Sequence, residues 1–456
     1  MSTHYDSIVI GTGQSGPSLA RRLSGSGRNI AVIERKRFGG TCVNTGCIPT
    51  KTLIASARAA WMARHAPDYG VEIASGISVN MKKVRARKDR IAGESENAVR
   101  AGLMDLDRCR VIQEHARLIG PHRVEVSGET LEAPEIFLNV GARAATPQIP
   151  GLDQVSYLTN SGMVDVDFLP DHLLILGGSY VALEFAQMYA RFGSRVTVVE
   201  RAANLLSRED GDVSQAVREI LESEQIRVVT AAKDISVSGH GDGQSIVVRW
   251  NGGEALGSHL LVALGRTPNT DDLGADAAGL KLDRRGYVEV DGQLRSNIPG
   301  LWALGDCNGK GAFTHTSYND YEIVAANLLD GGSRRVTDRI PAYNVYIDPP
   351  LARAGMSETE VRKSGKPALM GFRPMTKVGR AKEKGETKGF LKILVDAGSC
   401  QILGACLLGV ECDEVIHCIL DIMYAKAPYQ ILKDAVHIHP TVSELIPTVL
   451  GDLKPL

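Results

Sequence analysis

Two cysteines near the amino end are the residues best suited to chemistry. Cys42 and Cys47 lie in the stretch GGTCVNTGCI, where two glycines precede the pair and one lies within it. A zinc half-site would need a second pair of ligands, and Cys412 with Cys418 is a poor candidate because five residues separate them in a helical stretch. Inert core cysteines are a second interpretation, although the glycines before and between them indicate a tightly turned backbone, which inert cysteines do not require. A redox disulfide is the third, since a distorted first helical turn can bring two sulfurs into bonding range and its amino end favours thiolate.

A second set of residues, at the carboxyl end, is suited to proton exchange with thiols. The stretch HIHPTVSEL holds His437, His439 and Glu444. Histidine trades protons near neutral pH, which thiol–disulfide exchange requires, and a carboxylate on the other ring nitrogen would fix its tautomer. On a strand, His437 and His439 would share a face, so half of a metal site is an alternative, although no third ligand is evident. We therefore expect an acid–base pair and no metal site.

An internal repeat supplies two candidate nucleotide-binding modules. Residues 8–35 can be laid over residues 174–201 without a gap, and each copy reads as an apolar strand, a glycine turn, a helix and a second strand ending in an acid. The paired positions are Gly11 with Gly177, Gly27 with Gly193, Glu34 with Glu200 and Arg35 with Arg201. Two matches in register make coincidence a poor explanation. The sequence predicts two βαβ units.

The first copy has the residues that a dinucleotide requires. Gly11 permits the tight turn, Gly13 lets the backbone approach a pyrophosphate, and Gly16 lets the helix pack closely on the strand. The amino end of the helix presents unpaired N–H groups to phosphate. Glu34 is placed to accept hydrogen bonds from a ribose diol.

The second copy departs from this pattern at one position. Ser179 replaces the middle glycine, whereas Ala182 is an accepted substitute at the third position. A packing turn without a ligand is the alternative interpretation. We favour a nucleotide site, because Glu200 falls where the ribose-binding acid is expected.

Composition excludes several classes of protein. The 456 residues suggest about three domains at roughly 100–200 residues each. With 52 basic and 53 acidic side chains, the charge balance favours neither nucleic acid nor an anionic membrane as a partner. No secretory signal and no membrane-spanning apolar run are visible, and eight cysteines are too few for a disulfide scaffold. We expect a cytoplasmic protein.

The rest of the chain shows further boundaries. The stretch IPGLWALGDCNG places Asp306 directly after an apolar run, where an acid could bond a sugar or ribityl hydroxyl or simply cap a helix. Residues 260–270 resemble a strand and turn that leave the second module. From about Pro341 the sequence pattern changes. The strand-like stretches GFLKILVD and QILGACLLG precede a helical segment there, which indicates a further domain.

The stretch GGTCVNTGCIPTKTL resembles the active-site signature of the pyridine nucleotide-disulfide oxidoreductases with a C-x4-C motif, which include glutathione reductase, dihydrolipoamide dehydrogenase and mercuric reductase. The resemblance covers nearly the whole chain. It implies an α/β protein with two Rossmann-like dinucleotide-binding domains, for FAD and NAD(P), and a carboxy-terminal α+β dimerisation domain. The implied limits are 1–149 and 271–338 for the FAD domain, 150–270 for the NAD(P) domain and 339–456 for dimerisation.

The resemblance also implies roles for individual residues. Cys47 would be the charge-transfer thiol beside the flavin, and Cys42 the interchange thiol that attacks the substrate. Lys51 would lie near the reactive nitrogen of the flavin, and Glu184 would be its acidic partner. Tyr180 would cover the flavin until nicotinamide displaces it, although an ordinary core or surface tyrosine is a serious alternative.

The motif H-P-T-x-x-E resembles the acid–base motif of the family. It selects His439 as the acid–base group and Glu444 as the residue that orients it, both serving the cysteines of the neighbouring subunit in a homodimer. The predicted cofactor-binding residues are Gly11, Gly13, Gly16, Glu34, Gly40, Thr41, Gly141, Asp306, Gly177, Ser179, Tyr180, Glu200, Arg201 and Gly265.

Other stretches narrow the choice of substrate. CIPTKTL, YNDYEIVAANLL, IDPPLARAGM and APYQILKD resemble a bacterial group of mercuric-reductase-like flavoproteins associated with reactive-chlorine resistance, whose members reduce hypothiocyanous acid or copper(II). The tail LGDLKPL lacks the cysteine pair of mercuric reductases. We therefore expect the electron acceptor to be a small oxidant such as hypothiocyanous acid, and we include disulfides and metal ions in this class. Dihydrolipoamide dehydrogenase, a mercuric-reductase-like metal-ion reductase and a non-enzymatic flavin-binding protein are the alternatives.

The coenzyme preference depends on the end of the second repeat. Glu200 should accept a hydrogen bond from a free ribose 2′-hydroxyl and repel a 2′-phosphate, which favours NADH over NADPH. Arg201 and Arg208 lie close enough in sequence to blunt this preference.

Overall fold

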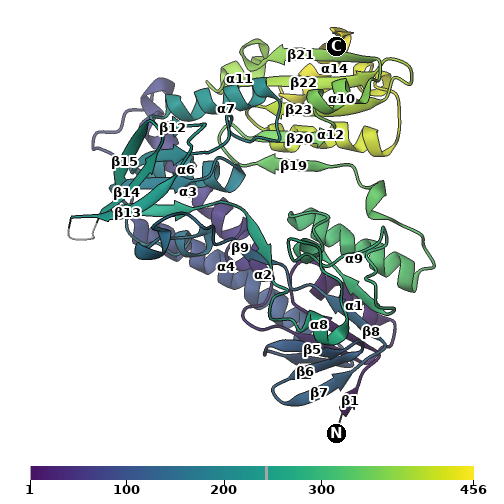
Figure 1. Cartoon of the computed structure of the whole chain (residues 1–456). Helices are drawn as coiled ribbons and strands as arrows, with labels where there is room; N and C mark the ends of the chain where they lie inside the picture. The colour runs from purple at the N-terminus through teal and green to yellow at the C-terminus, as the bar shows by residue number, and fades with distance from the viewer. Residues whose placement is uncertain (1, 242–244) are drawn as a thin grey trace.

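The computed structural model describes residues 2–241 and 245–456, and it has three regions that can be followed in Figure 1. The first lies around the amino end, the second contains α6 and α7, and the third is the sheet that contains β20 to β23. No helix in the described residues is long and apolar enough to cross a membrane.

The first region is built on a five-stranded parallel sheet in the order β18-β8-β2-β3-β4. Its central strands are buried, as expected where both faces of a parallel sheet are covered. α1 and α9 pack on one face, and a mixed sheet in the order β1-β7-β6-β5, in which only the β1–β7 pair is parallel, shares the core on the other. The elements are β1 (Ser2–His4), β2 (Ser7–Ile10), α1 (Gly16–Gly25), β3 (Ile30–Ile33), β4 (Cys109–Ile112), β5 (Ala116–Gly120), β6 (Arg123–Val126), β7 (Glu129–Glu132), β8 (Glu135–Leu138), α8 (Ala275–Ala278), β18 (Leu301–Ala303) and α9 (Thr314–Leu329).

The second region repeats this plan with the parallel order β12-β11-β10-β16 and an antiparallel sheet β13-β14-β15. The two predicted βαβ units are therefore confirmed as β2-α1-β3 and β10-α6-β11. A two-stranded antiparallel ribbon of β9 and β17 lies where the chain leaves the first region and returns to it. The elements are β9 (Ala142–Ala144), α5 (Asn160–Met163), β10 (His172–Leu176), α6 (Tyr180–Phe192), β11 (Arg195–Val199), α7 (Gly211–Ser223), β12 (Arg227–Val229), β13 (Ser236–His240), β14 (Ser245–Trp250), β15 (Gly253–Gly257), β16 (His259–Val262) and β17 (Arg266–Pro268).

The third region is a six-stranded antiparallel sheet in the order β19-β20-β23-β22-β21-β24 with helices packed on it. The predicted strands GFLKILVD and QILGACLLG are found as β22 and β23. The elements are β19 (Ala342–Val345), β20 (Leu351–Gly355), α10 (Glu358–Ser364), β21 (Ala368–Pro374), α11 (Gly379–Glu383), β22 (Phe390–Asp396), β23 (Ile402–Leu408), α12 (Cys412–Tyr424), α13 (Gln430–Lys433), α14 (Ile446–Gly451) and β24 (Lys454–Pro455). The predicted domain limits at residues 149, 270 and 338 stay predictions.

Three further helices connect these regions: α2 (Gly40–Asn44), α3 (Cys47–Arg64) and α4 (Met81–Met104). α3 packs against both α4 and α6. One core cluster includes Leu53 of α3, Phe185 of α6 and Leu351 of β20. The helix that begins at Cys47 is therefore anchored on the second and third regions.

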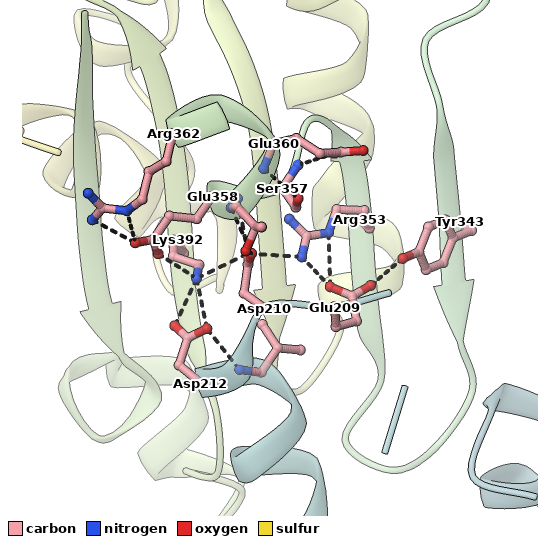
Figure 2. A network of polar contacts seen from close by, with 12 residues as sticks. Glu209, Asp210, Asp212, Tyr343, Arg353, Ser357, Glu358, Glu360, Arg362 and Lys392 are labelled. Atoms are coloured by element: carbon pink, nitrogen blue, oxygen red, sulfur yellow. Dashed lines mark hydrogen bonds and ion pairs between the residues drawn. The ribbon is translucent and has the colours of Figure 1, made fainter. Parts of the chain in front are cut away.

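A buried charge network joins the second region to the third (Figure 2). Asp210, which precedes α7, accepts hydrogen bonds from the backbone N–H groups of Glu358 and Thr359, each at 3.0 Å. Burial would raise the pKa of Asp210, but these two N–H groups lower it to about 2. Arg353 of β20 pairs with Glu209, and Lys392 of β22 lies 3.4 Å from Asp210. The network fixes the start of α7 against the sheet.

Candidate active site

The two cysteines lie on two helices, not on one. α2 carries Cys42 and ends at Asn44, and α3 begins at Cys47, so the prediction that both lie in one distorted first turn is wrong. Gly46 stands at the break, where a Cβ would lie 2.9 Å from the carbonyl oxygen of Thr41. This close approach lets the chain fold back on α2, which brings the two sulfurs together.

A second glycine seats α2 on the first nucleotide turn. Gly40 has φ +63°, and a Cβ there would lie 2.9 Å from Cα of Gly13. The side chain of Asn44 closes the short helix by donating to the carbonyl oxygens of Phe38 and Gly40 at 2.8 and 2.9 Å. The thiol pair is therefore positioned directly beside the phosphate-binding turn predicted from the sequence.

The two thiols have opposite proton affinities. A hydrogen bond with Cys42 lowers the pKa of Cys47 to about 6, against the raising effect of burial and with help from Thr314 and Lys51. The same hydrogen bond and burial raise the pKa of Cys42 above its ordinary value. In the dithiol, Cys47 is therefore the thiolate at neutral pH and Cys42 keeps its proton. Cys47 is exposed and Cys42 is half-buried.

Lys51 and Glu184 form the ion pair that the sequence predicted. The Lys51 ammonium lies 2.7 Å from Oε2 of Glu184, whose side chain is only 4% exposed. A residue that sequence reasoning missed, Tyr346, contacts both partners: its backbone N–H donates to Oε1 of Glu184 at 3.0 Å, and its ring centroid lies 4.6 Å from the ammonium. The pair lies at the junction of α3, α6 and the segment after β19.

An aromatic cluster lies on another side of the thiols. Tyr180, half-buried at the start of α6, packs against Phe313 with ring centroids 5.7 Å apart. Phe313 also stacks on His315 and Tyr343. Thr314, the next residue, places Oγ1 3.3 Å from Sγ of Cys47. Tyr180 is thus near the thiol site, as a flavin-covering tyrosine would have to be, and His315 belongs to the same cluster.

The first nucleotide turn is held by a residue that the prediction missed. Oδ1 of Asn139, at the end of β8, accepts from the backbone N–H of Gly16 at 3.1 Å, and its Nδ2 donates to the carbonyl oxygen of Leu304 at 3.0 Å. Glu34 accepts from the N–H and hydroxyl of Thr12 at 3.0 and 2.7 Å. Each carboxylate oxygen has more than one lone pair, so a ribose hydroxyl remains a compatible donor.

The second turn is braced in a similar way. Glu200 accepts from the backbone N–H groups of Gly178 at 2.5 Å and Ala202 at 2.7 Å. Ser179 directly precedes α6 with an extended backbone, its side chain makes no capping hydrogen bond, and it is exposed, as are Arg201 and Arg208. The acid therefore lies against the turn that contains Ser179, whereas the effect of the two arginines on the coenzyme stays a prediction.

The remaining predicted positions border the first region. Asp306 pairs with Arg266 of β17 at 2.9 Å, and burial raises the pKa of its carboxyl group. Arg266, which the sequence did not single out, also donates to the carbonyl oxygen of Ala142 at 2.6 Å. Gly141 and Gly265 both have positive φ, at +68° and +107°, on the two sides of the β9–β17 ribbon.

The histidine pair lies in another part of the molecule. Nδ1 of His439 lies 2.9 Å from Oε2 of Glu444, and the histidine side chain is 79% exposed. The pair just precedes α14, which is far from α2 in Figure 1. The segment is irregular, so it does not form the strand on which His437 and His439 would share a face, and the ring of His437 bonds to the carbonyl oxygen of Ser443 at 2.9 Å. Within the chain, His439 cannot reach the cysteines.

The first turn fits an FAD pyrophosphate. A Cβ at Gly13 would lie 2.8 Å from Oδ1 of Asn139, so only glycine keeps the backbone of this turn uncovered at the amino end of α1. Cys47, at the start of α3, is also exposed. The second turn, with Ser179 and Glu200, fits the pyrophosphate and ribose of a nicotinamide nucleotide.

Known proteins match both parts of the chain. Residues 5–320 match the family described as pyridine nucleotide-disulphide oxidoreductase, and residues 341–450 match the dimerisation domain of that family. The chain is a pyridine nucleotide-disulphide oxidoreductase. Its α/β fold is also that of a solved family member, the HOCl-induced flavoprotein disulfide reductase RclA from Escherichia coli. The two have a TM-score of 0.90 and 34% identity, covering 99% of this chain and 100% of the other.

Curated relatives place this oxidoreductase among several enzymes. The probable pyridine nucleotide-disulfide oxidoreductase RclA of Escherichia coli strain K12 is 34% identical over 99% of both chains. The dihydrolipoyl dehydrogenase of Chlamydia muridarum is 30% identical over 98% of this chain and 96% of the relative. A mercuric reductase of Bacillus cereus is 29% identical over 91% of this chain and 66% of the relative. The family is therefore established, whereas the electron acceptor differs among its members.

Proposed function

We propose that the protein is an FAD-dependent NAD(P)H oxidoreductase that passes electrons through the Cys42–Cys47 pair to a small oxidant, with hypothiocyanous acid as the first candidate. The observation that carries the proposal is the placement of the two thiols at the break between α2 and α3, where Gly40 seats α2 against Gly13 of the first nucleotide turn. In this proposal the protein acts as a cytoplasmic homodimer, and the partner subunit supplies the histidine pair.

Each residue of the chain has a defined task in this proposal. A bound FAD would take a hydride from reduced nicotinamide and pass two electrons to the disulfide. Lys51 favours the Cys47 thiolate that is released, because its charge lowers the pKa of that thiol. Cys42 keeps its proton until His439 of the partner subunit accepts it, which frees Cys42 to attack the oxidant.

The overall exchange with hypothiocyanous acid balances. One thiol, one thiolate and HOSCN give the disulfide, thiocyanate and water: the S–O bond breaks, the two sulfurs of the protein are oxidised, and the sulfur of the oxidant is reduced. The RclA likeness supports this candidate, since that solved relative is described as HOCl-induced.

Dihydrolipoamide is the second candidate substrate. The 30% identity to a dihydrolipoyl dehydrogenase over nearly the full chain and the His439–Glu444 pair at 2.9 Å favour it. For the coenzyme, we propose NADH. Glu200 lies at the ribose end of the second turn, where a carboxylate repels a 2′-phosphate. We expect kcat/KM to be about tenfold higher for NADH than for NADPH.

Steady-state assays with the flavin-loaded protein test the proposal. Reduced nicotinamide consumption is followed with hypothiocyanite, lipoamide, glutathione disulfide, copper(II) and mercury(II). Cys42→Ser and Cys47→Ala should each lower turnover by at least about 10³-fold with the preferred acceptor. Cys109→Ser, a half-buried cysteine on β4, is the matched control and should keep full turnover. Undiminished turnover in Cys42→Ser would overturn the dithiol route, and a clear preference for lipoamide would replace the first candidate by the second.

A further inference from the structure

Tyr346 is the one residue of the third region that contacts both members of the Lys51–Glu184 pair among the contacts described. Its backbone N–H donates to Oε1 of Glu184 at 3.0 Å, while Lys51 occupies Oε2 of the same carboxylate at 2.7 Å. Its ring centroid lies 4.6 Å from the Lys51 ammonium. One tyrosine therefore holds the anion through its backbone and the cation through its side chain.

The backbone at Tyr346 is well anchored. Its neighbours Val345 and Ile347 are both 2% exposed and belong to the core cluster that also contains Leu53 of α3 and Phe185 of α6. The ring therefore has a defined place relative to α3 and α6. A ring fixed in this way can restrict a flexible lysine.

Lys51 needs such a restraint. Its side chain is 32% exposed, and its ammonium has one carboxylate partner. Lysine is a point charge on a four-carbon stem with about 2 kcal/mol of rotamer entropy, so a single carboxylate allows several positions of the ammonium. The face of an aromatic ring attracts a cation and selects among those positions.

The position of this ammonium matters because several neighbouring groups together set the pKa of Cys47. Cys42 faces it from α2, Lys51 from its own helix α3, Glu184 and Tyr180 from α6, and Thr314 from α9. Lys51 lowers the pKa of the thiol and Glu184 raises it. A small movement of the ammonium away from the thiol therefore changes the balance between the two charges.

We propose that Tyr346 is a positioning residue of the thiol site, which holds the Lys51 ammonium with its ring face and the Glu184 carboxylate with its backbone N–H, so that the third region sets the charge beside Cys47. This inference rests on the proposed function. It assigns to the segment after β19 a task beyond packing, and it predicts that the ring, not the hydroxyl, is what matters.

The test is a pH titration of the flavin-loaded homodimer in a Cys42→Ser background. The readout is the long-wavelength charge-transfer absorbance between the Cys47 thiolate and oxidised flavin, which gives the pKa of Cys47 without turnover. Tyr346→Phe should leave the midpoint in place. Tyr346→Leu should raise it by about 0.5–1 pH unit, because the cation–π contact is lost while the backbone N–H remains.

A double-mutant cycle separates positioning from a general structural effect. Lys51→Met should raise the midpoint by about one unit. If Tyr346 acts through Lys51, adding Tyr346→Leu to Lys51→Met causes no further rise. Additive shifts, or equal shifts in the phenylalanine and leucine variants, would overturn the inference. Tyr346→Met takes the place of the leucine variant if the latter does not fold.

The same titration distinguishes this inference from the function on which it rests. Absence of the band in the protein with Tyr346 intact would overturn the thiol–flavin couple and, with it, the role of Tyr346. A band whose midpoint is the same with tyrosine and leucine would overturn the role of Tyr346 alone.

Discussion

The thiol site and the charge network before α7 both place a lysine among carboxylates, but they surround it to different degrees. Lys51 is 32% exposed and contacts one carboxylate and one ring face. Lys392 is 1% exposed and lies 2.8, 3.1 and 3.4 Å from Asp212, Glu358 and Asp210 (Figure 2). The charge of Lys392 is cancelled by its neighbours, whereas that of Lys51 is left to act on a thiol.

The difference shows that a lysine can either hold two parts of a protein together or change the pKa of a neighbouring group. A buried cation enclosed by anions holds parts of a protein together, because separating them would expose uncompensated charges. A partly exposed cation with one anionic partner can in addition shift the proton affinity of a neighbouring thiol. Changes at the two sites should therefore be seen in different measurements.

The largest expected effect is on stability. Lys392→Met removes the cation from beneath three carboxylates and should lower the free energy of unfolding by about 3–5 kcal/mol, because breaking a buried pair leaves unpaired charge. Thermal unfolding of the apoprotein measures it. The matched control is Lys363→Met, an exposed lysine of α10, which should unfold at the native temperature. A Lys392→Met protein as stable as the native one would show that Lys392 does not hold the two regions together. An unchanged pKa of Cys47 in the same variant would show that the network and the thiol site act independently.

The next effect is on proton affinity. The pKa of Cys47 is about 6, below the value of a free thiol, so the thiolate contributes stability above the unfolded pKa and this contribution is lost as pH falls through about 6. Lys51→Met should raise the midpoint by about one unit relative to the same protein with Lys51, since an opposite charge no longer favours the thiolate. Titration of the thiolate band measures it. An unchanged midpoint would show that Lys51 does not act on Cys47.

The smallest effect concerns a single hydrogen bond. Thr314→Val removes the hydroxyl that lies 3.3 Å from Sγ of Cys47 and should raise its pKa by about half a unit. Thr314→Ser keeps the hydroxyl and is the control. An unchanged pKa in Thr314→Val would show that this hydroxyl does not stabilise the Cys47 thiolate.

Local patterns in the sequence predicted much of the fold and of the site. The gap-free repeat predicted both βαβ units, because strand, glycine turn, helix and terminal acid lie within 28 residues of one another. Lys51 and Glu184 were paired from a family resemblance, and the structure brings them within 2.7 Å. What could be predicted depended on short-range signals or on a motif.

Contacts between distant segments could not be predicted in this way. Asn139 contacts Gly16 across 123 residues and Tyr346 contacts Glu184 across 162, so no local spacing reveals either. A polar residue directly after a buried strand was the one available signal for Asn139. The segment around the histidines is irregular, which agrees with Pro440 having no N–H to donate to a sheet.

The ribbon of β9 and β17 bears on how such a protein can diversify. The chain crosses into the second region and back again at two adjacent, hydrogen-bonded strands, so the covalent connections of everything between them lie side by side. That insert carries Glu200 of the second nucleotide turn, but also Glu184, which pairs with Lys51, and the helix α6, which packs on α3. An exchange of the insert would therefore change the surroundings of Cys47 together with the second turn, so the two sites have to vary in step.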